Sequence, residues 1–366
     1  MAANDEQVAD WFSKPGDSVR AGMQRRGLSA EQLASHFDNG MSEVRELLDG
    51  SRSIDGPVAR VLSDTLGGSE DFWLKRQENF EKALQNAVYE EIESAEKWLE
   101  KVPMPRVAGR RTKKSIDALQ AEVRRRMIFY NVPTLASWER RYGEIKSQTH
   151  FRQSAAFKPE NDSVLLWLRR GEIEAGMVQT RLWSPGNLQD RLDAIRSLTK
   201  ISQPFRFLPK LRALCAEAGV ALVVVRTPQG CHASGATRLV SADKAMLLLS
   251  FRHRADDQFW FTVFHEIGHL LLHSAETFVD DADTPTNQFE DEANDFAQRC
   301  IIPAERKQEF EELKASREAI LRFSIAAGIA PGLTVGQMQY RGKIKHSQMN
   351  HLKRRWAWES IDHTVV

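Results

Sequence analysis

DQFWFTVFHEIGHLLLH, residues Asp257 to His273, is the stretch of this 366-residue chain that decides its fold. Its apolar residues recur at helical spacing, which predicts a buried helix with Asp256 or Asp257 as its N-terminal cap. His265 and His269 are four residues apart, so both imidazole rings project from the same face of that helix. Two imidazole nitrogens at this spacing can bind one tetrahedral zinc ion.

Glu266 follows the first of these histidines and would act as general base on a zinc-bound water, the role of the glutamate in H-E-x-x-H sites. The same pattern also occurs by chance in helices whose histidines are ordinary core residues. Burial favours the metal site, because two histidines and a glutamate are costly to bury without a partner. Gly268 leaves room for another element to approach closely. His273 continues the same face, and we expect it beside the ligands or in the core rather than as a fourth ligand.

A catalytic zinc site needs a third protein ligand and an open fourth position. The segment from Gln288 to Ile301 predicts a second helix, on which Glu290 and Asn294 share one face. We expect Glu290 to be the third ligand and Asn294 to hydrogen-bond a ligand. Glu292 is the alternative ligand. It lies about 200° around the helix from Glu290, so the two carboxylates cannot bind the same ion.

The region upstream of the motif predicts a small sheet. Residues 220–225 are apolar and β-branched, which is typical of a buried strand, and residues 237–240 and 245–249 predict two more strands. Helices are expected around residues 164–178, 188–198 and 208–218. The fold class is therefore mainly α with a small β-sheet. An additional donor to the oxyanion of a cleaved peptide bond is expected, and its unranked candidates, each of which could instead be structural, are Arg238, His232 and His253.

Short helices are predicted near the N-terminus. Ser29 and Gln32 form a capping-box pattern, and a second short helix from residue 42 to 48 is stopped by Gly50. Two short helices joined by a tight turn are the helix-turn-helix pattern. A further helix over residues 58–66 and a long one from about residue 70 to 101 are expected to follow.

In a helix-turn-helix the second helix enters the major groove of DNA. The candidate DNA contacts here are Ser42, Arg45 and Arg52. Glu43 and Glu46 lie on the same helix and would repel phosphate groups. A module for dimerisation or for docking a protein partner is therefore the alternative interpretation.

Composition narrows the class of protein further. The formal net charge is +1, so any contact with nucleic acid must come from a local basic patch. The three cysteines, Cys215, Cys231 and Cys300, are widely separated, which favours a reducing compartment over a disulfide framework. The first residues do not read as a signal peptide, and no apolar run is long enough to span a bilayer. We expect a cytoplasmic protein with no membrane contact.

The motifs resemble a known family. FWFTVFHEIGHLLLH, followed by E-x-x-A-N-x-F-A and then Ile302-Pro303, resembles the ImmA/IrrE family of metallo-endopeptidases over roughly residues 165–341. The resemblance implies a zincin-like, gluzincin-type domain. It also implies that His265, His269 and Glu290 hold Zn²⁺ and that Glu266 is the catalytic base.

The N-terminal RGLSAEQLASHF and the later Phe72, Trp73 and Gln77 are similar to the HigA/XRE class of antitoxin-type helix-turn-helix proteins. We accordingly divide the chain into a helix-turn-helix part with its long following helix (1–105), a helical connector (106–164), the metallopeptidase domain (165–341) and a C-terminal helical tail (342–366). This fusion implies a regulatory endopeptidase that cleaves a DNA-binding repressor or an antitoxin-type protein.

Two other functions share the same residues. A DNA-binding transcription regulator or antitoxin could use the metallopeptidase-like domain to sense a metal, ligand or partner without cleaving anything. A protein-interaction module that masks a partner would leave the H-E-x-x-H helix as inert core. Helix-turn-helix modules commonly pair on two-fold sites, so a homodimer is a further expectation.

Overall fold

The computed structural model describes residues 13–105, 115–150, 159–273, 278–281 and 288–361. It divides into two compact units, residues 1–151 and residues 152–366. Helices predominate and the sheet is small, so the expected fold class is confirmed. The finer division into four parts stays a prediction.

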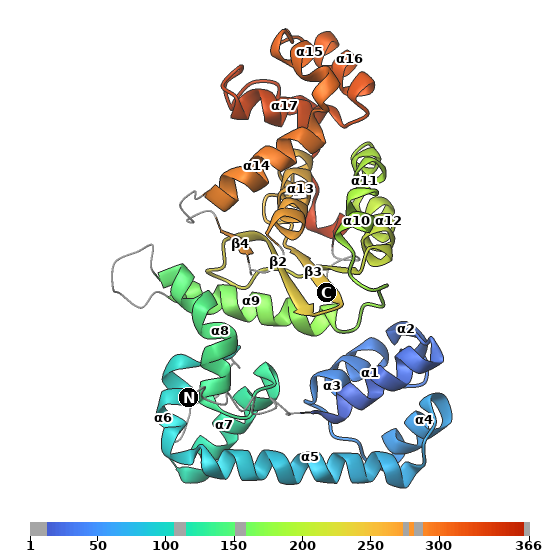
Figure 1. The fold of residues 1–366 in the computed structure, drawn as a ribbon, viewed down its shortest axis with the longest axis vertical. Helices are drawn as coiled ribbons and strands as arrows, with labels where there is room; N and C mark the ends of the chain where they lie inside the picture. Colours follow the sequence, from blue (N-terminus) through green and yellow to red (C-terminus); the bar gives the residue numbers. More distant parts are fainter. Residues whose placement is uncertain (1–12, 106–114, 151–158, 274–277, 282–287, 362–366) are drawn as a thin grey trace, which may run out of the picture. The chain divides into compact units, whose positions relative to one another are not determined.

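The first unit is entirely helical in its described part (Figure 1). The capping box of Ser29 and Gln32 is present, with each side chain accepting a hydrogen bond from the other residue's backbone. The predicted second helix ends at Gly50, whose φ of 83° is left-handed. The described helices of the first unit are α1 (Pro15–Arg26), α2 (Ala30–Ala34), α3 (Gly40–Asp49), α4 (Gly56–Leu66), α5 (Glu70–Glu90), α6 (Ala95–Lys101), α7 (Ile116–Tyr130) and α8 (Leu135–His150), with the 3-10 turn η1 (Ile92–Ser94) before α6.

The long helix expected over residues 70–101 is broken, so that prediction was wrong. Helix α5 stops at Glu90, and Glu91 has a ψ of 2° that does not continue a helix. The carboxylate of Glu91 accepts hydrogen bonds from Trp98 Nε1 at 2.8 Å and from the backbone of Leu135 at 3.3 Å. After the break, α6 packs against α7, and Trp98 is completely buried.

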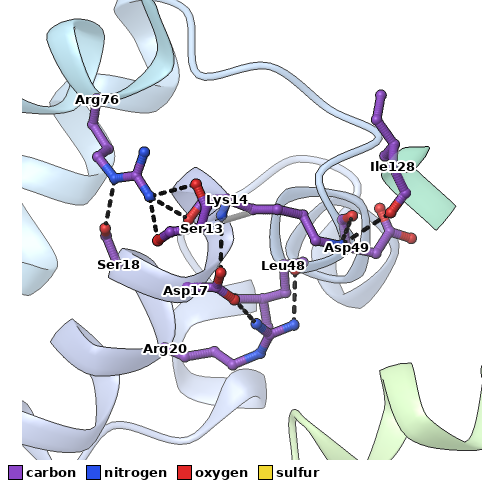
Figure 2. Close-up of polar contacts among 9 residues, drawn as sticks. All are labelled: Ser13, Lys14, Asp17, Ser18, Arg20, Leu48, Asp49, Arg76 and Ile128. Atoms are coloured by element: carbon purple, nitrogen blue, oxygen red, sulfur yellow. Dashed lines mark hydrogen bonds and ion pairs between the residues drawn. The ribbon is translucent and has the colours of Figure 1, made fainter. Parts of the chain in front are cut away.

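A network of hydrogen bonds from two positively charged side chains holds the C-terminal end of α3 (Figure 2). Lys14 is buried, and its Nζ donates to the backbone oxygens of Asp49 and of Ile128 in α7. Arg20 of α1 donates to the backbone oxygen of Leu48 at 2.8 Å. The last carbonyl groups of a helix lack intrahelical partners and carry partial negative charge, so two cations stabilise this end. The network thereby fixes α3 against α1 and α7.

The second unit contains a mixed four-stranded sheet in the order β1-β3-β2-β4. Strand β1 (Val220–Val224) runs parallel to β3 (Lys244–Leu249), and β2 (Ala233–Ser241) is antiparallel to both β3 and β4 (Phe278–Asp281). The three predicted strands are present, and β4 was not predicted. Every residue of β1 is buried, as expected for an apolar strand inside the sheet's helical cover.

Helices cover both faces of this sheet (Figure 1). Helix α9 (Pro159–Ala175) packs on one face, and α13 (Asp256–Leu272) packs on the other. Helix α14 (Gln288–Ile301) lies against α13. The other helices of this unit are α10 (Pro185–Gln189), α11 (Leu192–Leu198), α12 (Pro204–Glu217), α15 (Lys307–Glu311), α16 (Arg317–Ala327) and α17 (Pro331–Tyr340), with 3-10 turns η2 (Ala304–Arg306), η3 (Asn350–Leu352) and η4 (Trp358–Ser360).

Two expectations for this unit need correction. The single helix expected around residues 188–198 is two helices, α10 and α11, separated by a turn. Neither Asp256 nor Asp257 caps α13, because the cap residue is Ala255 and makes no side-chain cap bond. The carboxylate of Asp256 instead accepts the backbone N–H of Arg354, from the C-terminal part of the chain, at 3.0 Å.

The described helices include no single candidate for a membrane span. None of them alone is both long and apolar enough to cross a bilayer. Helices α16 and α17 meet the requirement only as a pair, and the pair is bent by 110°.

Candidate metal centre

Helices α13 and α14 bring three potential metal ligands together. The Nε2 atoms of His265 and His269 lie 3.1 Å apart. The carboxylate of Glu290 lies 3.2 Å from Nε2 of His265 and 3.5 Å from Nε2 of His269. Within the described part of the chain, these three residues form a group whose ligand atoms all lie within 4.8 Å of one another.

The spacing of these atoms can be compared with that of a zinc site. Zinc binds nitrogen and oxygen ligands at about 2.0–2.1 Å, so tetrahedral geometry separates its ligand atoms by about 3.3–3.4 Å. The observed separations of 3.1, 3.2 and 3.5 Å bracket that value. The three side chains therefore fit a zinc ion without any rearrangement of the two helices.

The charge states of the cluster suit a bound cation. Burial lowers the pKa of His269, against the opposite effect of Glu290, and favours the neutral imidazole that a metal ligand needs. Burial alone would raise the pKa of Glu290, but hydrogen bonds and positive charge from the two histidines lower it to about 2. A bound cation would favour the same two states, the neutral imidazole and the ionised carboxylate.

Close packing of α13 and α14 makes the cluster possible. A Cβ at Gly268 would lie 3.1 Å from the ring of Phe296 and 3.3 Å from Cα of Ala293, both on α14. Gly268 therefore permits the close approach that its position in the motif suggested. At this separation, Glu290 in the first turn of α14 reaches the histidines on α13.

Asn294 and Glu292 occupy different places around this cluster. Asn294 Oδ1 lies 3.0 Å from Nδ1 of His265, which leaves Nε2 of that ring facing the cluster. Glu292, the alternative ligand, lies outside the cluster, where its carboxylate is 2.8 Å from Nε2 of His273. Nδ1 of His273 is in turn 3.3 Å from Nδ1 of His269. The structure thus brings Glu290, and not Glu292, to the two histidines of the motif.

Glu266 is completely buried and is held from strand β2. The hydroxyl of Thr237 donates a hydrogen bond to its Oε2 at 3.1 Å. A Cβ at Gly235 would lie only 2.5 Å from its Oε1, so the glycine leaves space for the carboxylate. Sequence reasoning gave neither residue a role. A glycine inside a strand, which signals close approach of another group, was the available sign.

The three candidate donors to the oxyanion are placed as follows. Arg238 forms an ion pair with Glu172 of α9 at 2.6 Å, on the face of the sheet away from α13. His253 precedes α13, and the nine residue-to-residue steps from Asp256 to His265 correspond to about 13 Å of helix. The backbone oxygen of His232 accepts a hydrogen bond from Arg252. Arg238 and His253 are thus not brought to the cluster.

The predicted DNA contacts lie on and after α3 in the first unit. Ser42 donates to Glu46 at 3.3 Å, and Arg52 forms an ion pair with Glu43 at 2.9 Å. Arg45 is half-buried on the same helix. The two glutamates that would repel DNA are therefore both engaged within the unit, and each takes up one of the predicted contacts.

Part of the second unit matches a known protein family. Residues 220–326 match the Peptidase_M78 family, described as an IrrE N-terminal-like domain. The matched segment spans β1 to α16 and contains His265, Glu266, His269 and Glu290. It indicates a metallopeptidase-like domain. No curated protein matches the chain. The match does not reach the first unit, where the helix-turn-helix resemblance stays a prediction.

Proposed function

We propose that this chain is a zinc-dependent endopeptidase whose metal ligands are His265, His269 and Glu290. The observation that carries the proposal is the ligand cluster with the spacing of a zinc site, built on a helix that also presents Glu266. The Peptidase_M78 match over the same residues supports proteolysis as the activity.

Each residue then has a defined task. When bound, zinc would polarise the peptide carbonyl and lower the pKa of its water toward ~7. Glu266 accepts the proton of the attacking water on its carboxylate and passes it to the amine that leaves. Thr237 keeps that carboxylate in place through its hydroxyl. Asn294 orients the ring of His265 so that Nε2 faces the cluster.

The proposed substrate is a DNA-binding repressor or an antitoxin-type protein. This part rests on the resemblance of the N-terminal sequence to HigA/XRE proteins, because a peptidase fused to such a module is suited to act on a related regulator. The first unit would then dock the substrate, or DNA, while the second cleaves.

The experiment compares all protein N-termini in host cells that carry either wild type or Glu266→Gln, with and without DNA damage. Glutamine keeps the size of the side chain but cannot take up the proton. We expect a new N-terminus, within a DNA-binding protein, only with wild type. Identical N-termini under both conditions would contradict proteolysis and favour a regulator that senses without cutting.

A further inference from the structure

His269 is connected through its second ring nitrogen to two more side chains. Its Nδ1 lies 3.3 Å from Nδ1 of His273, one helical turn further along α13. Nε2 of His273 lies 2.8 Å from the carboxylate of Glu292 on α14. The three side chains form a continuous line from the ligand cluster to Glu292, whose side chain is 44% exposed.

The protons along this line can be assigned from the proposed metal site. A ring nitrogen that binds a metal carries no proton, so His269, with Nε2 in the cluster, has its proton on Nδ1. That N–H needs an acceptor, and Nδ1 of His273 lies within reach. His273 must then carry its own proton on Nε2, which faces the carboxylate of Glu292. Each N–H in this assignment has an acceptor.

Aromatic side chains hold the two rings in the planes that this line requires. Phe278 of β4 stacks on His269, with ring centroids 4.0 Å apart and an interplanar angle of 11°. Phe289 of α14 meets His273 edge-on at 4.8 Å. Packing thus fixes the ring planes, while the hydrogen bonds decide which nitrogen of each ring carries the proton.

We propose that His273 and Glu292 are positioning residues, which fix the tautomer and orientation of His269 and so raise the affinity for zinc. Asn294 holds His265 in the same way, through one direct hydrogen bond. The inference rests on the proposed function, since it assumes that the cluster binds zinc. Removal of the partner of a ligating histidine costs about 10- to 100-fold in metal affinity.

The test measures the zinc dissociation constant of the full-length chain by competition with a chromogenic chelator. His273→Phe and Glu292→Ala should each weaken binding about 10- to 100-fold. Glu292→Gln retains an oxygen that can accept from His273, so its affinity should stay close to that of wild type. Glu312→Ala is the matched control, because Glu312 is an exposed glutamate that accepts from Gln308 just as Glu292 accepts from Gln288.

A second measurement separates positioning from general stability. Nitrogen-15 NMR of the imidazole rings distinguishes the two tautomers, and zinc-loaded wild type should show His273 with its proton on Nε2. Glu292→Ala should lose that preference while the metal-free protein melts at an unchanged temperature. Wild-type affinity in both His273→Phe and Glu292→Ala would overturn the inference alone. A wild-type chain that binds no zinc would instead overturn the proposed function.

Discussion

At the scale of single residues, the second unit holds the proposed metal ligands and the proposed base from different elements. The ligand cluster is held from α14, through Glu290 and Asn294, whereas Glu266 is held from β2 on the sheet side of α13. Thr237 and Glu266 are both almost completely buried, so their hydrogen bond is not weakened by competing water. Changes at Thr237 should therefore affect the base and leave the metal in place.

Thr237→Val tests this separation. Valine has nearly the same shape as threonine but cannot donate, and a hydrogen bond to a charged group contributes about 1.5–3 kcal/mol. We expect the cleavage rate, measured on the substrate that the comparison of N-termini identifies, to fall about 10- to 100-fold with unchanged zinc content. Thr237→Ser keeps the hydroxyl and should restore most of the rate. Equal rates for valine and threonine would show that the contact does not position Glu266.

Site residues that are close together along the chain could be predicted from the sequence, whereas contacts between distant residues could not. His265 and His269 are four residues apart, so the 3.6-residue period alone places them on one face of the helix. The choice of Glu290 over Glu292 stayed open, because it depends on how α14 is rotated against α13. Thr237 contacts Glu266 across 29 residues, and only the packing of β2 against α13 reveals it.

At the scale of elements, the N-terminus of α13 is held by the C-terminal strap, residues 353–356. Ala255 and Arg355 form an antiparallel bridge, and Lys353 forms a buried ion pair with Asp257 at 2.6 Å. Gly332 of α17 leaves room for the carboxylate of Asp256, since a Cβ there would lie 2.3 Å from it. The strap thus fixes the helix that carries the ligands, although it lies outside the segment that matches the peptidase family.

Asp256 makes the stability of this contact depend on pH. Burial raises its pKa from 3.8 to about 6, and the charge of Asp257 adds to the increase, whereas the backbone N–H groups of Arg354 and Asp257 and the Arg354 side chain oppose it. A folded-state pKa above the unfolded one means that the folded state binds more protons between these values. Stability from this group is therefore present below about pH 4 and lost as pH rises through 6, by at most about 3 kcal/mol.

Asp256→Asn should remove this dependence, because the amide oxygen can still accept from Arg354 but carries no charge. We expect the variant to gain stability relative to wild type between pH 5 and pH 8, by about 1–3 kcal/mol in the free energy of unfolding. Urea denaturation at the two pH values measures the difference. Parallel pH profiles for the two proteins would mean that Asp256 does not titrate in this range.

Sequence patterns located most elements but not their interruptions. The periodicity of α13 and α14 predicted both helices, since their apolar residues face one core. The break after α5 depends on Glu91 binding Trp98 and the backbone of a later helix, which no local pattern encodes. Strand β4 reads FVDD, and four residues with two aspartates carry no strand signal until β2 pairs with them.

At the scale of the whole molecule, the proposed metal centre and the helix-turn-helix resemblance lie in different units. The ligand cluster, the base and the family match all lie within residues 152–366. The predicted DNA contacts lie in residues 1–151, and two of them are engaged by glutamates of α3. The three described ligands of the proposed metal centre therefore all come from the second unit, so zinc content tests this centre whatever the first unit binds.

The zinc content of the purified full-length chain tests the metal centre most directly. After equilibration with zinc and removal of the excess, we expect one zinc ion per chain in wild type and in Glu266→Gln. His265→Ala and Glu290→Ala should bind it at least 10-fold more weakly, because each removes a ligand. A wild-type chain that retains no zinc, or a Glu290→Ala chain that binds zinc as tightly as wild type, would contradict the proposed centre.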